Sequence, residues 1–590
     1  MAKHSKERWA EPHFALLAAL ALTTACDGGA AGGPKPGQGQ PSAGSGGGAN
    51  VAGGTGTAGT PGLGGSGPCV GNDVPVPKRL VRLSFNQLSN AVRSLTNETL
   101  ATTIATTYEI GDSEHRTFPP LASPREGSVF TDANWAKGDK IAADVGKYIA
   151  DNAATTTTCG AAPSADCAKE FVLSFAERAF RRPLNDTEKA SLTAVLTAVT
   201  AAGGTASNQL QYGVYAALES PHFLYRTEFG ESPVAAGPLG AFEVASQLSF
   251  FLTDAPPDQP LLDAAKLGAL STPEQVSAQV KRILALPASK QNLQDAIYSY
   301  FGLYGLENVI INSPDFTEPV RNSMLRESEL FLQNNLWGAK LSDMLTTRKS
   351  TINATLAPLY GATAPTTGLD ADGFGTVDLP ANRAGILTNL GFLSARSRPN
   401  QPSVVGRGLL VNAALLCAEN PAFPAGLAAQ IEEVSAQQVD ATERAKSQYR
   451  TTTAPCSGCH VGFDPYGLAL GNFDGIGRYT TMDPQGRAID PSVLLPPNAG
   501  GVQVMSAVEM ADKLASGGGF AACMAKNVMA FALAETPTDG EAGAALKLDG
   551  CATQAVTAGF NKSGQSFSDL VEQVAVSNTL GQRSAGQGAK

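Results

Sequence analysis

The sequence has little charge for its length. Only 16% of its 590 residues are charged, and the formal net charge is −10. No cluster of Lys and Arg supplies the positive surface that binds the phosphates of a nucleic acid, so a nucleic-acid partner is not expected. Beyond the N-terminal region, no apolar run is long enough for a membrane-spanning helix.

Signatures of common enzyme classes are missing as well. The sequence shows no Ser/His/Asp triad, phosphate-binding loop or paired-carboxylate site. Sites assembled from distant residues leave no such signature. Whether the protein is an enzyme therefore stays open at this point.

The N-terminal residues have the pattern of an export signal. Three basic residues precede a short apolar stretch, 14–25, which ends at Cys26. The letters LTTAC resemble a bacterial lipobox, although Thr stands where Leu is usual. We expect residues 1–26 to be a lipoprotein signal peptide with an acyl chain on Cys26; ordinary cleavage that leaves a free cysteine is the alternative.

The segment after this cysteine is predicted to be a tether. Residues 27–68 are almost entirely Gly, Ala, Ser, Thr, Pro and Gln, which cannot bury enough apolar surface to fold. We therefore expect a disordered linker over 27–76 that holds the body near a membrane lipid. The predicted location is the cell envelope, either the periplasm or the outer surface.

Export would place the remaining cysteines in an oxidising compartment. Of nine cysteines, six remain after Cys26 and the two in the APCSGCH motif are set aside, and an even number favours three disulfides. The first two predicted pairs are close in sequence, and the third follows by elimination; buried free thiols are the alternative. The pairs are Cys159–Cys167, Cys523–Cys551 and Cys69–Cys417.

The motif APCSGCH has the CxxCH spacing of a c-type haem attachment site. The thiols of Cys456 and Cys459 would bond to one porphyrin edge, while His460 would be the proximal iron ligand. Zinc would need two further Cys or His ligands nearby, and a thioredoxin-like dithiol would need a βαβ pattern that is missing. We predict one covalent haem c, with a plain Cys456–Cys459 disulfide as the alternative.

The sixth iron ligand is open. Met505 and Met510 lie at the downstream separation familiar from small class I cytochromes, and Met482 also follows the motif. Met505 is the predicted ligand, although a single Met is more often a core residue. An open position would instead favour oxygen or peroxide chemistry, with His222 as a candidate distal residue.

From about residue 77 the sequence predicts a mainly α fold. Asn185 with Glu188 forms a capping-box pattern, and Thr272 with Gln275 does the same before apolar residues at helical spacing. The segment that follows the CxxCH motif is rich in Gly and Asp and is expected to be dominated by loops. The fold class is thus a multi-domain helical body with a loop-rich module near the C-terminus.

Several segments together resemble a family of large exported bacterial proteins, the planctomycete-type cytochrome c-like proteins, which consist of consecutive domains of unknown function. The similar segments are 79–95, 167–188, 218–228, 242–265, 382–411 and, most specifically, 454–490. The resemblance implies contiguous modules and a haem c site at Cys456, Cys459 and His460. It identifies neither a substrate nor a distal ligand.

The domain boundaries expected on this basis divide the body into five modules. They are an N-terminal helical module (77–148), a disulfide-containing helical module (149–206), a further helical module (207–345), a cytochrome c-like module with the CxxCH motif (380–498) and a C-terminal helical module (499–585).

Polar residues near the motif are candidates for contacts with the haem. Arg478 is predicted to bind a haem propionate, and Tyr479 and Asn472 lie close to it in sequence. Asp464 and Asp474 could equally cap turns, as Asp does in Gly-rich loops.

The sequence thus predicts a membrane-tethered, exported electron-transfer protein with one haem c and a redox partner protein. The upstream modules would dock that partner or a substrate. A haem-dependent peroxidase or oxygenase is the first alternative, and a non-enzymatic surface lipoprotein that binds polymer is the second.

Overall fold

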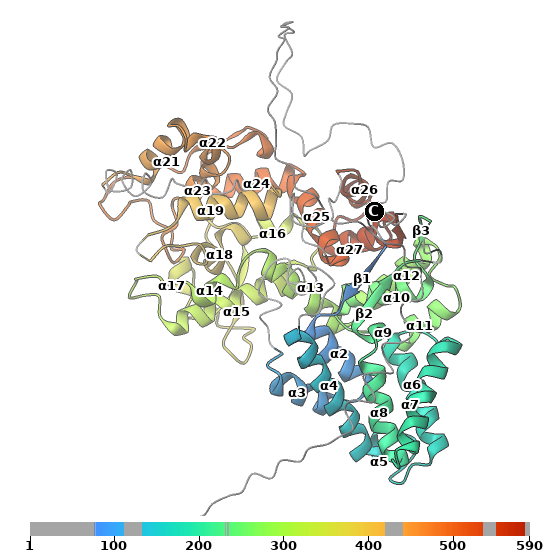
Figure 1. The fold of residues 1–590 in the computed structure, drawn as a ribbon. Coiled ribbons are helices and arrows are strands. Elements are labelled where there is room, and N and C mark those ends of the chain that lie inside the picture. The colour runs from blue at the N-terminus through green and yellow to red at the C-terminus, as the bar shows by residue number, and fades with distance from the viewer. Residues whose placement is uncertain are drawn as a thin grey trace, which may run out of the picture.

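In the computed structural model, the described residues are 76, 78–110, 132–230, 232, 235–399, 401–418, 440–534 and 550–584. Within them the chain is mainly helical, with four two-stranded antiparallel sheets, which confirms the predicted fold class. Helices α2–α8 gather at one end of the molecule and α21–α23 at the other (Figure 1). None of the helices in this part of the chain has the length and apolar character needed to cross a membrane.

The N-terminal unit is a helical bundle closed by a short sheet. Strand β1 pairs with β2, so that Arg79 lies opposite Glu228, and α8 packs against α4, α6 and α7. One apolar core runs through this unit, and the predicted boundaries after residues 148 and 206 fall inside it. Its elements are β1 (Arg79–Arg82), α2 (Phe85–Leu95), α3 (Glu98–Thr107), α4 (Asp132–Asp151), α5 (Ala153–Thr156), α6 (Ala165–Phe180), α7 (Asp186–Ala201), α8 (Ala206–Leu218), α9 (Pro221–Leu224) and β2 (Tyr225–Glu228).

The middle of the chain adds a second group of helices. Helices α10, α12 and α13 share the main apolar core with α24–α27. Helix α15 packs on β4 and contributes to a smaller core. The elements are β3 (Gly237–Pro238), α10 (Ala241–Thr253), α11 (Gln259–Lys266), α12 (Pro273–Leu284), α13 (Pro287–Tyr300), α14 (Gly305–Asn308), α15 (Glu318–Asn335), α16 (Asp343–Thr346), β4 (Lys349–Ile352), α17 (Ala357–Tyr360) and β5 (Gly375–Asp378).

The C-terminal part contains short helices and, between Ala469 and Val493, no helix or strand, as the Gly- and Asp-rich sequence predicts. Its elements are the 3₁₀ helix η2 (Ile386–Thr388), α18 (Leu390–Ser394), α19 (Val404–Leu410), the π-helix η3 (Val411–Leu415), α21 (Glu443–Thr452), α22 (Ser457–His460), α23 (Asp464–Ala469), β6 (Val493–Leu494), the 3₁₀ helix η4 (Pro497–Ala499), β7 (Gln503–Val504), α24 (Ala507–Ser516), α25 (Gly519–Leu533), α26 (Gly550–Lys562), α27 (Phe567–Ala575), α28 (Asn578–Gly581) and β8 (Gln582–Arg583).

Both predicted helix starts are confirmed. Asn185 accepts a hydrogen bond from the backbone N–H of Glu188, whose side chain accepts one from the backbone N–H of Asn185. Thr272 and Gln275 form the same reciprocal pair at the start of α12. These caps satisfy backbone N–H groups that a helix start leaves without an intrahelical partner.

The structure contains two described disulfides, of which one was predicted. Cys159–Cys167, with an S–S distance of 2.00 Å, confirms the local prediction. Cys523 is bonded to Cys417 at 2.13 Å, so the predicted pairs Cys523–Cys551 and Cys69–Cys417 are wrong. The reason is tertiary packing, because α25 lies against η3 and brings Cys523 beside the end of that helix.

The predicted N-terminal features are not all within the described residues. The signal peptide with Cys26, almost the whole linker 27–76 and Cys69 lie outside them.

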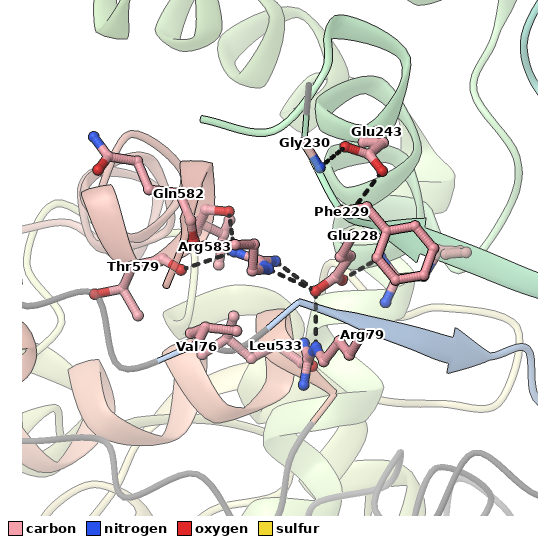
Figure 2. Close-up of polar contacts among 12 residues, drawn as sticks. Val76, Arg79, Glu228, Phe229, Gly230, Glu243, Leu533, Thr579, Gln582 and Arg583 are labelled. Carbon is pink, nitrogen blue, oxygen red and sulfur yellow. Dashed lines mark hydrogen bonds and ion pairs between the residues drawn. The ribbon is translucent and has the colours of Figure 1, made fainter. Parts of the chain in front are cut away.

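The two ends of the folded body meet at Glu228 (Figure 2). Its carboxylate oxygen Oε2 accepts hydrogen bonds from Arg79 Nε at 2.8 Å and from Arg583 Nη2 at 2.5 Å. Strand β8, which carries Arg583, also pairs with β3, and the backbone N–H of Ser584 donates to the carbonyl of Val76 at 2.8 Å. The C-terminal segment is therefore fastened to the start of the body.

Candidate haem c site

The CxxCH motif forms the short helix α22 and the residue before it. Cys456 is the N-cap residue, and its carbonyl accepts hydrogen bonds from the backbone N–H groups of Cys459 and His460 at 3.1 Å each. Both thiols are free and half-buried, so the alternative of a Cys456–Cys459 disulfide is not what the structure shows. Cys459 also packs against the main apolar core, which fixes the helix on the body.

The imidazole of His460 is held by a carboxylate one helical turn later. Its Nδ1 lies 2.9 Å from Oδ1 of Asp464, and the ring lies against Phe463 with centroids 4.9 Å apart. Asp464 is fully buried, and its Oδ2 accepts a hydrogen bond from Arg450 Nε of α21 at 2.8 Å. The nitrogen Nε2 of His460 has no hydrogen-bond partner among the described residues.

A close helix crossing places this carboxylate. Helices α19 and α23 touch through two glycines, and a side chain at either position would collide with the other helix or the residue before it. A Cβ atom on Gly467 would lie 1.9 Å from the carbonyl oxygen of Val404, and one on Gly408 would lie 2.2 Å from that of Phe463. Only glycine allows this approach. The close packing places the start of α23, and with it Asp464, next to His460 of the motif.

Two buried arginines hold the loop that follows. Arg407 donates to the carbonyl oxygens of Phe473 and Asp474 at 2.6 Å each, and Arg383 donates to the carbonyl of Gly477 at 2.8 Å. Both side chains are fully buried, and burial lowers the pKa of Arg407 to about 10. The carbonyl groups that a loop leaves unpaired thereby gain partners.

The two candidate turn-capping aspartates have different roles. Asp474 accepts hydrogen bonds from the backbone N–H groups of Ile476 and Arg478 at 2.9 Å each. It therefore caps a turn, which is one of the two roles that the sequence suggested for it. Asp483 repeats this arrangement with Arg487. Within the described part of the chain, the carboxylate of Asp464 instead hydrogen-bonds to the side chains of His460 and Arg450, so it belongs to the candidate site.

Arg478, the predicted propionate ligand, already has two carboxylate partners. Its Nε lies 2.7 Å from Asp474 Oδ2, and its Nη1 lies 2.5 Å from Asp315 Oδ2. Burial alone would lower the pKa of Arg478, but the hydrogen bonds to these two carboxylates raise it above its ordinary value. A propionate contact by Arg478 stays a prediction, and the propionate would compete with both carboxylates.

The candidate ligands for the sixth position lie in different surroundings. Met510 is fully buried in the main core, whereas Met505 and Met482 are 57% and 51% exposed. Ligation by Met505 therefore stays a prediction. His222 lies in the N-terminal unit, where its Nε2 is 3.0 Å from Glu188 Oε1 and its ring lies against Phe180, as expected for a histidine with satisfied hydrogen bonds.

The residues present fit a covalently attached haem. Two free thiols and an imidazole with one uncommitted nitrogen stand on one short helix, which is the donor set of haem c. In addition, Arg450 Nη2 is buried and has no hydrogen-bond partner within the described part of the chain. An anionic group at this position, such as a haem propionate, would satisfy that donor.

Sequence reasoning did not find Arg450, Arg383 or Arg407. All three look like ordinary arginines in the sequence, for which exposure is the normal expectation. In the structure Arg383 and Arg407 are fully buried and Arg450 is half-buried. The one available signal was the position of Arg450 in α21, six residues before Cys456, which places it in the segment that leads into the motif.

Three stretches of the chain match models of protein families. Residues 167–228 match a protein of unknown function, DUF1595 or PSD5; residues 239–362 match DUF1592 or PSD4; and residues 383–483, which include the CxxCH motif, match DUF1588 or PSCyt3. No curated protein and no solved structure matches the chain. The three matches follow one another along the chain and together have the domain pattern of the planctomycete-type cytochrome c-like multi-domain proteins, the family that the sequence resembles.

Proposed function

We propose that the protein is an exported, membrane-anchored carrier of one covalent haem c that transfers electrons. The observation that carries this proposal is the helix α22, which presents two free thiols and an imidazole whose orientation is fixed by buried Asp464. The match of the PSCyt3 family model over the same segment supports it.

Each residue of the site has a definite part in this proposal. Cys456 and Cys459 would form the two thioether bonds, and Nε2 of His460 would bind the iron. Arg450 would offer its unpartnered N–H group to an anionic edge of the group. Haem c supplies reversible one-electron oxidation and reduction, and the surrounding protein sets its potential by ligation, hydrogen bonding and burial.

The location of the carrier follows from the N-terminal sequence. An acyl chain on Cys26 and the Gly-rich linker would hold the body near a membrane, where a redox partner protein would exchange electrons with it. The two disulfides, Cys159–Cys167 and Cys417–Cys523, support an oxidising compartment outside the cytosol.

An optical spectrum tests the proposal. The full chain is produced in a host with a cytochrome c maturation system, and spectra are taken oxidised, reduced with dithionite, and reduced with carbon monoxide. Sharp low-spin c-type bands that carbon monoxide leaves unchanged are the expected result. The double variant Cys456→Ser/Cys459→Ser is the control and should lose haem that survives denaturing electrophoresis.

The other outcomes separate the alternatives. A shift of the bands by carbon monoxide would indicate an open iron position and favour a haem enzyme of the peroxidase or oxygenase type. A wild-type protein without covalent haem would contradict the proposal and leave the surface-binding lipoprotein as the remaining reading.

A further inference from the structure

We propose that Asp464 is a positioning residue that fixes the tautomer of His460 and lowers the reduction potential of the haem through its negative charge. The inference rests on the proposed function, because it concerns the residue behind the iron ligand. It goes further in assigning a role to a side chain outside the CxxCH motif and in giving the direction of a measurable quantity.

The contact requires one arrangement of the imidazole proton. An ionised carboxylate can only accept hydrogen bonds, so Nδ1 of His460, at 2.9 Å from Asp464 Oδ1, must carry the proton. The lone pair is then on Nε2, the nitrogen that has no partner in the described part of the chain. The ring is thus ready to bind iron through Nε2 and cannot turn over without losing this hydrogen bond.

The spacing makes the contact an intrinsic part of the local fold. Asp464 follows His460 by four residues and opens α23, whose position is fixed by the contact of Gly467 with the backbone of α19. Asp464 is fully buried, so its direction is set by packing and not by solvent. The carboxylate is therefore held at the imidazole by the packing of the fold.

A carboxylate does more than orient the ring. A backbone carbonyl in the same place would fix the tautomer equally well, but a carboxylate also brings a negative charge, which makes the ligand more basic. Higher ligand basicity and nearby negative charge favour the ferric over the ferrous state, which lowers the potential.

The carboxylate of Asp464 is paired with one arginine. Its one cationic partner in the described residues is Arg450, through Nε at 2.8 Å, and the Nη2 group of that arginine has no hydrogen-bond partner. The two residues should therefore act on the potential in opposite directions, because one brings a negative and the other a positive charge near the ligand.

The test compares the midpoint potentials of haem-loaded variants by spectroelectrochemical titration. Asp464→Asn keeps a carbonyl acceptor but removes the charge, and we expect at least a tenfold shift of the oxidised-to-reduced ratio toward the reduced form, which is 59 mV upward for one electron. The matched control is Asp474→Asn, whose carboxylate caps a turn in the same module and should leave the potential within a twofold ratio of the wild type.

Arg450→Gln provides a second, opposite test that does not depend on the first variant. It keeps an N–H donor for Asp464 and removes the positive charge, so the potential should fall. An unchanged potential in haem-loaded Asp464→Asn would overturn the proposal. If Asp464→Asn does not retain haem, a potential that does not fall in Arg450→Gln would overturn it.

Failure of the inference is distinguishable from failure of the proposed function. Haem staining after denaturing electrophoresis reports covalent attachment in each variant before any potential is measured. Wild-type protein without attached haem would contradict the proposed function itself, whereas attached haem with a potential insensitive to both charges would contradict only the role of Asp464.

Discussion

Glu228 and Asp464 are both buried carboxylates, but they have different neighbours. Glu228, which is 1% exposed, pairs with the charged side chains of Arg79 and Arg583 (Figure 2). Arg226 lies 3.8 Å from its other carboxylate oxygen. Asp464 is 0% exposed and lies between one arginine and the imidazole of His460. Within the described residues, the ion-pair partners of Glu228 are arginines. Asp464 instead contacts an imidazole whose Nε2 has no hydrogen-bond partner among the described residues and which stands next to two free thiols.

This difference separates a structural charge cluster from the candidate functional one. The partners of Glu228 come from both ends of the folded body, so its ion pairs fasten the C-terminal segment to β1 and β2. Burial works to raise the pKa of Glu228, yet Arg583, Arg79 and Arg226 together lower it far below its ordinary value. Burial of charge alone therefore does not identify a site; a side chain that can bind something else is also needed.

The largest expected effect is that of Glu228→Gln. The change leaves the buried arginines without their shared anion, and breaking a buried pair in this way costs about 3–5 kcal/mol of unfolding free energy. Denaturant unfolding followed by circular dichroism measures it. The potential of the haem should not move, because the described ion-pair partners of Glu228 all lie outside residues 380–498.

A matched control and a pH series sharpen this test. Glu98→Gln removes the exposed pair of Arg93 and Glu98 and should cost less than about 1 kcal/mol. The pKa of Glu228 is lowered on folding, so its stabilisation is present above the ordinary pKa of a glutamate and is lost as the pH falls toward the lower folded-state pKa. Equal losses in Glu228→Gln and Glu98→Gln would contradict the structural role of the cluster.

A third buried carboxylate, Glu327, has a raised pKa, whereas the pKa of Glu228 is lowered. Burial raises its pKa to about 7, although hydrogen bonds from Tyr360 at 2.5 Å and Ser350 at 2.7 Å and the charge of Arg383 lower it. The folded protein then holds a proton that the unfolded chain has lost. Stability should therefore fall as the pH rises from about 4.5 to about 7, by a total on the order of 3 kcal/mol.

Glu327→Gln tests whether stability falls with rising pH because of this side chain. The amide keeps a carbonyl oxygen for Tyr360 and Ser350 but cannot ionise, so the difference in unfolding free energy between variant and wild type should grow in favour of the variant over this pH range. Unfolding curves at pH values between 4.5 and 8 give that difference. A difference that does not depend on pH would show that Glu327 keeps its ordinary pKa.

The helix crossing behind Asp464 gives a smaller expected effect. In Gly467→Ala the new methyl group would lie 1.9 Å from the carbonyl oxygen of Val404, so α23 must shift away from α19. Overpacking of this kind costs about 1–3 kcal/mol. Since α23 carries Asp464, we also expect the haem potential to move upward, in the direction of Asp464→Asn.

Gly458→Ala is the control for the helix crossing. It places a methyl group inside the CxxCH motif itself, where the added Cβ would meet no atom within 4 Å apart from its chain neighbours and the backbone of its own helix. Its stability and potential should match those of the wild type. If Gly467→Ala behaved like Gly458→Ala, the close contact between the helices would not be what holds Asp464 in place.

The sequence predicted those features that depend on nearby residues. The caps at Asn185 and Thr272 and the disulfide Cys159–Cys167, whose cysteines are 8 residues apart, are set by local geometry. The disulfide Cys417–Cys523 joins residues 106 apart and depends on how η3 and α25 pack. No local pattern in the sequence contains that information.

The candidate site, too, was predicted only where a local sequence pattern marks its residues. The CxxCH spacing identifies three candidate residues because covalent attachment of haem c requires that spacing. Asp464 was noticed, but a turn cap was as good an explanation until its carboxylate was seen at the imidazole. Arg450, Arg383 and Arg407 were missed, since their partners are a carboxylate and loop carbonyls that only the folded chain brings to them.

The smallest expected effect is that of Arg478→Gln, which tests the weight of exposed charge pairs in the same module. The guanidinium and both of its carboxylate partners are partly exposed, with side-chain exposures of 41%, 53% and 27%, so solvent screens the ion pairs. We expect less than about 1 kcal/mol of lost stability by denaturant unfolding, because exposed pairs rarely contribute more. Haem attachment and the midpoint potential should be unchanged. A loss of haem or a shifted potential in Arg478→Gln would instead favour the propionate contact first predicted from the sequence, and would show that Asp474 and Asp315 release this side chain when haem binds.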